Sequence, residues 1–64
     1  MMDIRTYFYD VATEEEQDEI ISVYENDDID FNAYCVERNI DLTIVDDRMG
    51  ETILTLWAWD ICGE

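Results

Sequence analysis

Carboxylates are the side chains whose number and spacing in this sequence most clearly suit a chemical task. The stretch VATEEEQDEIISVYENDDIDF, residues 11–31, contains nine Asp or Glu residues and no Lys or Arg. Clustered carboxylates serve acid–base hydrolysis, bind divalent cations or attract a positively charged partner. Each of these tasks makes a different demand on the rest of the chain.

Catalysis finds little support in the composition. The 64-residue chain contains no His, which excludes a Ser–His or Cys–His arrangement. Its 18 acids always provide some close carboxylate pairs, but so small a domain offers no cleft to position a substrate. We therefore expect that the protein is not an enzyme.

A dedicated metal or cofactor site is not expected either. DDIDFN, beginning at Asp28, resembles the opening of a calcium loop, with Asp30 and Asn32 in the third and fifth places. The sixth place, normally Gly, is Ala33, and the twelfth, normally Glu, is Asn39. The chain has no Cys-x-x-Cys for zinc and no glycine-rich loop for phosphate. The sequence thus predicts no metal and no cofactor.

The net charge of −15 sets the class of partner. A net charge of magnitude roughly 2 to 8 is enough to keep a small domain soluble. A charge this much larger is therefore expected to have a specific use. Such a surface repels nucleic-acid phosphates and anionic lipids, which excludes both as partners. There is no signal peptide and no apolar run of membrane-spanning length. These features predict a soluble cytoplasmic protein in which Cys35 and Cys62 stay reduced.

Three segments have the pattern of strands. Residues 2–11 and 40–46 alternate between apolar and polar side chains, and residues 51–61 form the longest apolar run. A turn ending in glycine, DRMG, joins the second segment to the third, which predicts a hairpin.

Two helices are predicted between the first and second strands. Thr13 and Glu16 have the spacing of a capping box, which predicts a helix beginning after Thr13. Asp30 suits the cap of a second, short helix over residues 31–38, and Asn39 suits a left-handed stop. The prediction is therefore a single α+β domain over residues 1–64 with the order β-α-α-β-β. Its three-stranded, mainly antiparallel sheet carries both helices on one face.

Such a sheet leaves one apolar face uncovered. In a strand, Trp57 and Trp59 point to the same side, as do Tyr7 and Tyr9. The sequence predicts that these four residues form an aromatic patch that binds a protein partner or a second copy of the chain. The alternative places Trp57 and Trp59 in the core, with the leucines of that strand outside.

The acidic residues are predicted to form a row along the first helix and the loop after it. A folded row of carboxylates fills a groove of Lys and Arg and loses less entropy on binding than a floppy tail. The predicted partner-binding acids are Glu14, Glu15, Glu16, Asp18, Glu19, Glu25, Asp27, Asp28 and Asp30.

In character, the chain resembles the small acidic DNA-mimic proteins of phages and mobile elements. That class includes anti-CRISPR proteins, anti-restriction proteins and uracil-DNA glycosylase inhibitors. The resemblance covers the whole chain and lies in its size, its extreme acidity, the lack of Lys and the compact α/β pattern. One string, ETIL at Glu51–Leu54, is similar to the Glu-Ser-Ile-Leu strand that glycosylase inhibitors push into the DNA groove of their target. Its other reading is the ordinary start of a hairpin strand.

The resemblance implies a DNA-mimic inhibitor acting in a bacterial host. The favoured partner is a CRISPR effector whose basic DNA-binding, PAM-reading surface the chain occupies. A uracil-DNA glycosylase or a restriction enzyme is the alternative target. From another class of function, the chain is an adaptor that binds a protein through a Tyr/Trp sheet face.

Overall fold

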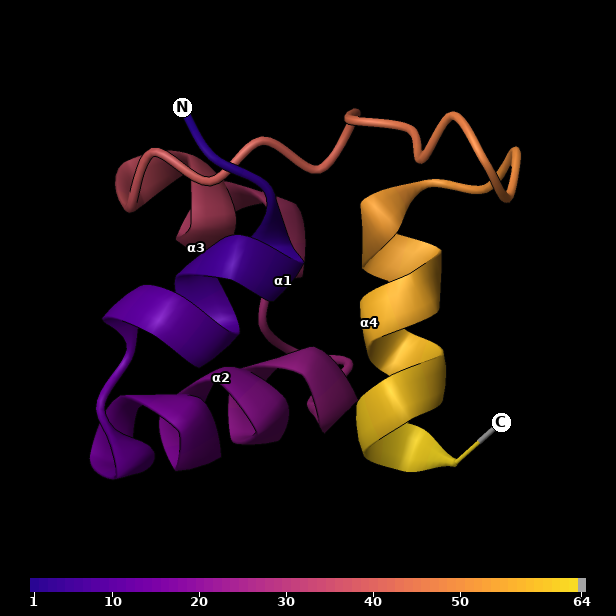
Figure 1. The fold of residues 1–64 in the computed structure, drawn as a ribbon. Coiled ribbons are helices and arrows are strands. Elements are labelled where there is room, and N and C mark those ends of the chain that lie inside the picture. Colours follow the sequence, from indigo (N-terminus) through magenta and orange to yellow (C-terminus); the bar gives the residue numbers. More distant parts are fainter. Residues whose placement is uncertain (64) are drawn as a thin grey trace.

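The computed structural model describes residues 1–63, which form helical segments around one apolar core (Figure 1). A short α-helix continues directly into a π-helical turn, and three further α-helices follow along the chain. In chain order the elements are α1 (Ile4–Thr6), the π-helical turn η1 (Tyr7–Val11), α2 (Glu14–Glu25), α3 (Phe31–Glu37) and α4 (Ile53–Cys62).

The predicted α+β fold with a three-stranded sheet is wrong. Within residues 1–63, β pairing is limited to two isolated bridges, Met2 with Ile40 and Val45 with Thr52. Two of the three predicted strands are helical. The second predicted strand, residues 40–46, is not helical and turns Ile40, Leu42 and Ile44 toward the core, but no strand lies beside it within residues 1–63.

The first strand prediction failed because its apolar spacing fits two structures. Ile4 and Phe8 are four residues apart, which puts them on one face of a strand and of a helix alike. The Asp3 carboxylate accepts a hydrogen bond from the Thr6 backbone N–H at 2.7 Å and caps α1. The segment therefore starts as a helix, and both Ile4 and Phe8 are buried.

Caps also make a helix of the third predicted strand. The Thr52 hydroxyl accepts a hydrogen bond from the backbone N–H three residues on, at 3.2 Å, and Gly63 ends α4 with a left-handed φ of 72°. Between these caps, Ile53, Leu56 and Trp57 have helical spacing, and all three are buried. A continuous apolar run is compatible with a strand and with a helix. The capping residues at its two ends therefore determine that this segment is helical.

The two predicted helices are confirmed, with their caps. The Thr13 hydroxyl accepts a hydrogen bond from the Glu16 N–H at 3.2 Å at the start of α2. The Asp30 carboxylate accepts one from the Ala33 N–H at 3.2 Å at the start of α3. Asn39, just beyond α3, has a φ of 60° and is the predicted left-handed stop.

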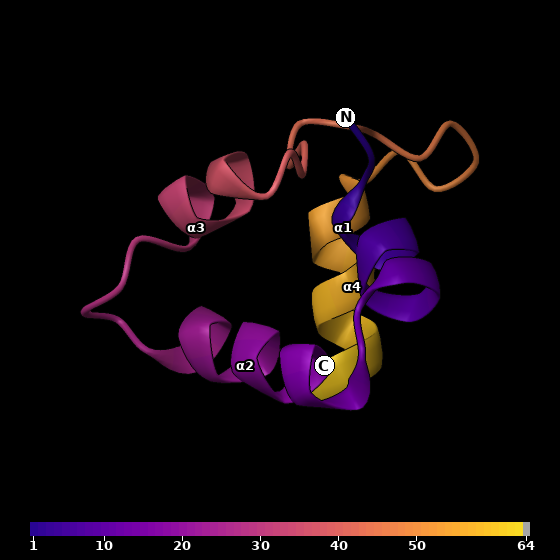
Figure 2. The ribbon, with the colours of Figure 1, turned by 90° about the vertical axis from the view of Figure 1, so that its left-hand side faces the viewer.

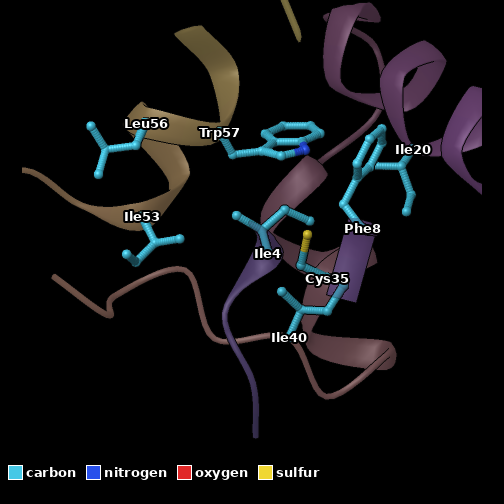
Figure 3. Close-up of a cluster of buried hydrophobic side chains, with 8 residues drawn as sticks. All are labelled: Ile4, Phe8, Ile20, Cys35, Ile40, Ile53, Leu56 and Trp57. Carbon is cyan, nitrogen blue, oxygen red and sulfur yellow. The ribbon is translucent and has the colours of Figure 1, made fainter. Parts of the chain in front are cut away.

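Trp57 lies in the centre of the core (Figure 3). Its fully buried indole ring stacks on Phe31, with ring centroids 5.9 Å apart, and meets Phe8 and Tyr24 edge-on at 5.4 and 5.2 Å. The helix α4 thus supplies a residue that η1, α2 and α3 pack around. The ribbon places α2 at one end of the molecule, roughly perpendicular to α4 (Figures 1 and 2). One side of α2 is therefore committed to the core, and the other faces solvent.

Candidate functional site

The acids predicted to bind a partner lie on α2 and on its connection to α3. The core side of α2 is formed by Ile20 and Val23, which are buried. Of the nine predicted acids, all but Glu16 are exposed. These exposed residues, here called the acidic row, are Glu14, Glu15, Asp18, Glu19, Glu25, Asp27, Asp28 and Asp30.

The helical register aligns part of the acidic row. At about 100° per residue, Glu14, Asp18 and Glu25 fall within roughly 40° of one another, on the side away from Ile20. The 12 residues of α2 span about 18 Å and carry five exposed carboxylates. That is about one charge per 3.6 Å, close to the roughly 3.4 Å per charge along one strand of DNA.

Glu16 differs from the other predicted acids because it belongs to the fold. It is half-buried, and its carboxylate accepts hydrogen bonds from the Tyr7 hydroxyl and the Thr13 hydroxyl, each at 3.3 Å. Burial, together with the neighbouring Glu16 carboxylate, raises the pKa of Tyr7. Glu16 thus ties η1 to the start of α2, a role that its place in the acid run does not reveal.

The acidic row is not neutralised by the chain's own arginines. Among residues 1–63, the one ion pair within 4 Å joins Arg5 to Asp46 at 3.6 Å. The Arg38 guanidinium lies over the ring of Tyr34, 3.7 Å from its centroid. Arg48 is exposed in the turn after Asp46. Every carboxylate of the row therefore faces solvent without an ion-pair partner in the described part of the chain.

Local helix physics explains only some of these charges. Glu14 and Glu15 stand in the first turn of α2, where the helix dipole favours acids. Glu25 stands in the last turn, where the dipole disfavours a carboxylate. Like charges four residues apart, such as Glu14 and Asp18, cost a further 0.2–0.5 kcal/mol per pair, roughly. Glu25 and the Glu14–Asp18 pair therefore work against the stability of the helix that carries them.

We expect the thermal stability of the protein to rise with added monovalent salt. The Debye length falls to about 10 Å at 0.1 M salt, which shortens the reach of the repulsion within the acidic row. Melting curves followed by circular dichroism, from low to moderate NaCl, measure the effect. A melting temperature that stays flat or falls over this range would contradict a self-repelling surface.

The predicted aromatic patch does not form, because residues 1–63 contain no sheet whose face could carry it. Trp57 is fully buried, as the core alternative expected for it, whereas Trp59 is 46% exposed. Residues two apart on a helix point about 200° apart, so these two side chains face nearly opposite ways. Tyr7 is half-buried against Glu16, and Tyr9 is exposed on η1. Of the four residues, Trp59 and Tyr9 remain available to a partner.

The described residues show no metal-binding group of three or more His, Cys, Asp or Glu side chains. No helix among them has the length and apolar character needed to cross a membrane. Cys35 is a buried free thiol on α3, and its burial raises its pKa to about 11. The Cys62 side chain lies outside the part of the chain that the structure describes.

Alkaline pH is expected to destabilise the protein. Burial raises the pKa values of Cys35, Tyr7 and Tyr34, so the unfolded chain loses these protons at a lower pH than the folded one. Their contribution to stability is complete below about pH 9 and is lost as the pH rises toward 11. Urea denaturation at pH 8, 9.5 and 10.5 measures the loss. Equal midpoints at the three pH values would contradict the burial of these groups.

No protein-family model, curated protein or solved structure shows significant similarity to the chain. The surface of the chain is therefore the basis for inferring its function.

Proposed function

We propose that this chain is a DNA-mimic inhibitor whose acidic row occupies the basic DNA-binding surface of a bacterial enzyme. The favoured target is a CRISPR effector that reads a PAM, the short DNA motif bound directly by the protein. In this role the carboxylates occupy the positions of DNA phosphates on the target. Lys and Arg side chains of the target then form the ion pairs that the acidic row does not form within the described part of the chain.

The observation that carries the proposal is a charged surface that the fold does not need. The first-turn acids and the α3 cap have structural uses, but Glu25, Asp27 and Asp28 cluster at the unfavourable end of α2. None of them forms an ion pair among the described residues. A basic partner would remove both the repulsion within the row and its conflict with the helix dipole.

The order of the segment supports a specific fit rather than a general attraction. The connection after α2 is pinned, because the Asn26 side chain accepts a hydrogen bond from the Asp28 N–H at 2.9 Å. The Asn26 carbonyl accepts a second one from the Ile29 N–H at 3.1 Å. Asp30 then caps α3. Carboxylates held in place lose less conformational entropy on binding than those of a disordered acidic tail.

A PAM-reading surface has the chemistry that such a row needs. Effectors of this kind read guanine edges with arginines in the major groove and hold the backbone in a positively charged channel. Uracil-DNA glycosylase and restriction enzymes offer related grooves and remain the alternative targets. The ETIL string does not favour the glycosylase, because Thr52 caps α4 and Ile53 and Leu54 lie inside that helix. A strand inserted into the target's groove is thus unavailable in this fold.

Competition with duplex DNA tests the proposal. A purified Cas9–guide complex is mixed with increasing amounts of the full chain, a labelled PAM-containing duplex is then added, and fluorescence anisotropy reports how much duplex is bound. We expect the chain to prevent DNA binding when it is added first. Poly-glutamate at the same total charge controls for acidity alone and should compete far less. Parallel assays use uracil-DNA glycosylase and a type I restriction enzyme with their own duplexes.

Displacement from one of the three targets supports a DNA mimic and identifies its class. If the chain leaves all three protein–DNA complexes intact, or if poly-glutamate displaces DNA as well as the chain does, the proposal fails. A protein-binding adaptor would then be the favoured function, although it could not use the sheet face first expected for it.

A further inference from the structure

The outward side of α4 presents an exposed tryptophan that the rest of the described chain does not cover. From Ile53 to Trp59 this helix contains no charged residue. A helix without a polar side is normally buried all round. Here the buried residues lie on one side only, and the ribbon places no other helix on the side of α4 that faces away from the core (Figure 1). That outward side presents Trp59, 46% exposed, one turn after the half-exposed Thr55.

The charges around this face indicate what covers it. Glu51, just before α4, and Asp60, beside Trp59, are both exposed carboxylates. A second copy of the chain brings its own net charge of −15, so electrostatics disfavours self-association at this face. A cationic surface meets no such penalty, and Trp is the aromatic residue that best receives a cation on its ring.

We propose that Trp59 is a docking residue that stacks against an arginine side chain of a basic protein partner. Guanidinium is planar and weakly hydrated, so it stacks on an indole ring while its N–H groups donate to a neighbouring carboxylate. Asp60, the next residue in the chain, is an exposed carboxylate that is available to accept such a bond. The identity of the partner rests on the proposed function, since a surface that reads guanines is rich in arginine. The cation contact itself is tested without that partner.

The two tryptophans allow the contact to be observed directly in the wild-type chain. Trp57 is fully buried, and Trp59 is the one that acrylamide reaches. The probe is nona-arginine, added to the full chain at moderate salt. We expect saturating nona-arginine to reduce the acrylamide quenching of the exposed tryptophan. The variant Trp59→Leu, which retains only Trp57, should show weak quenching with and without the probe.

Affinity gives a second readout. Trp59→Leu is expected to weaken nona-arginine binding roughly two- to thirtyfold, the range of a cation–π contact from exposed to desolvated sites. Trp59→Phe should fall between the wild type and Trp59→Leu, because it retains a smaller ring. Met49→Ala removes another exposed apolar side chain, outside α4, and should bind like the wild type. Circular dichroism verifies that each variant remains folded.

Two results would overturn the inference. One is unchanged acrylamide quenching at saturating nona-arginine together with wild-type affinity in Trp59→Leu. The other is a dimer of the wild-type chain in sedimentation analysis that Trp59→Leu abolishes, since a second copy would then cover the face. If no DNA-binding enzyme is displaced in the competition assays while the Trp59 contact is observed, the proposed function fails and this inference stands.

Discussion

Replacing Trp57 with alanine is expected to unfold most of the protein at room temperature. The indole ring is fully buried and contacts aromatic residues from η1, α2 and α3. Truncating a buried aromatic residue of this size costs roughly 3–5 kcal/mol. A chain of 64 residues has a total stability of only about 3–10 kcal/mol, and repulsion among its acids lowers it further. The loss of stability from Trp57→Ala is therefore comparable to most or all of the free energy of unfolding.

Far-UV circular dichroism and urea denaturation measure this effect. Trp59→Ala is the matched control, because it removes the same side chain from the exposed side of the same helix. We expect it to change stability by less than about 1 kcal/mol. Trp57→Phe should lie between the two, since it keeps an aromatic ring in the core. A Trp57→Ala protein that melts like the wild type would show that α4 does not complete the core.

Neutralising the aligned acids of α2 is expected to slow association with a DNA-binding target about tenfold or more. The triple variant Glu14→Gln, Asp18→Asn, Glu25→Gln removes the three carboxylates that share one line of the helix surface. Each exposed pair contributes only about 1 kcal/mol or less. Steering depends on the summed field, however, so the combined change acts mainly on the association rate. Stopped-flow binding to the Cas9–guide complex at two salt concentrations measures both the rate and its salt dependence.

The control variant must carry the same net charge. Asp10→Asn, Glu37→Gln, Asp47→Asn also removes three exposed carboxylates, but none of them lies on α2 or its following connection. It should associate faster than the α2 variant and keep a steeper salt dependence. If both triple variants slow association equally, only net charge matters, and the acidic row is an ordinary solvated surface.

The sequence predicted the parts of the fold whose signals are local. Thr13, Asp30 and Asn39 each fix the backbone within three residues, and the helices they bound are present as predicted. The exposed acids were also predictable. Like charges without partners cannot be buried, so their place at the surface follows from composition and helical register.

The strands could not be distinguished from helices by apolar pattern alone. The spacing of Ile4 and Phe8 satisfies both periods, and the run before Gly63 is apolar at nearly every position. The deciding signal lies in the caps Asp3 and Thr52, which the apolar pattern does not include. The incorrect strand at residues 51–61 also produced the incorrect aromatic patch. Trp57 and Trp59 share a face in a strand but point in nearly opposite directions in a helix.

The packing of α4 has a consequence for the order in which the protein is made. Synthesis proceeds from the N-terminus, so α1, α2 and α3 are made before Trp57 is added to the chain. Until then, Ile4, Phe8 and Ile20 lack the ring around which they pack. The acidic segment that emerges early is thus a loose polyanion at first. It becomes a shaped surface only when α4 is available to pack against it, so a product truncated before α4 would carry most of the charge without the folded surface.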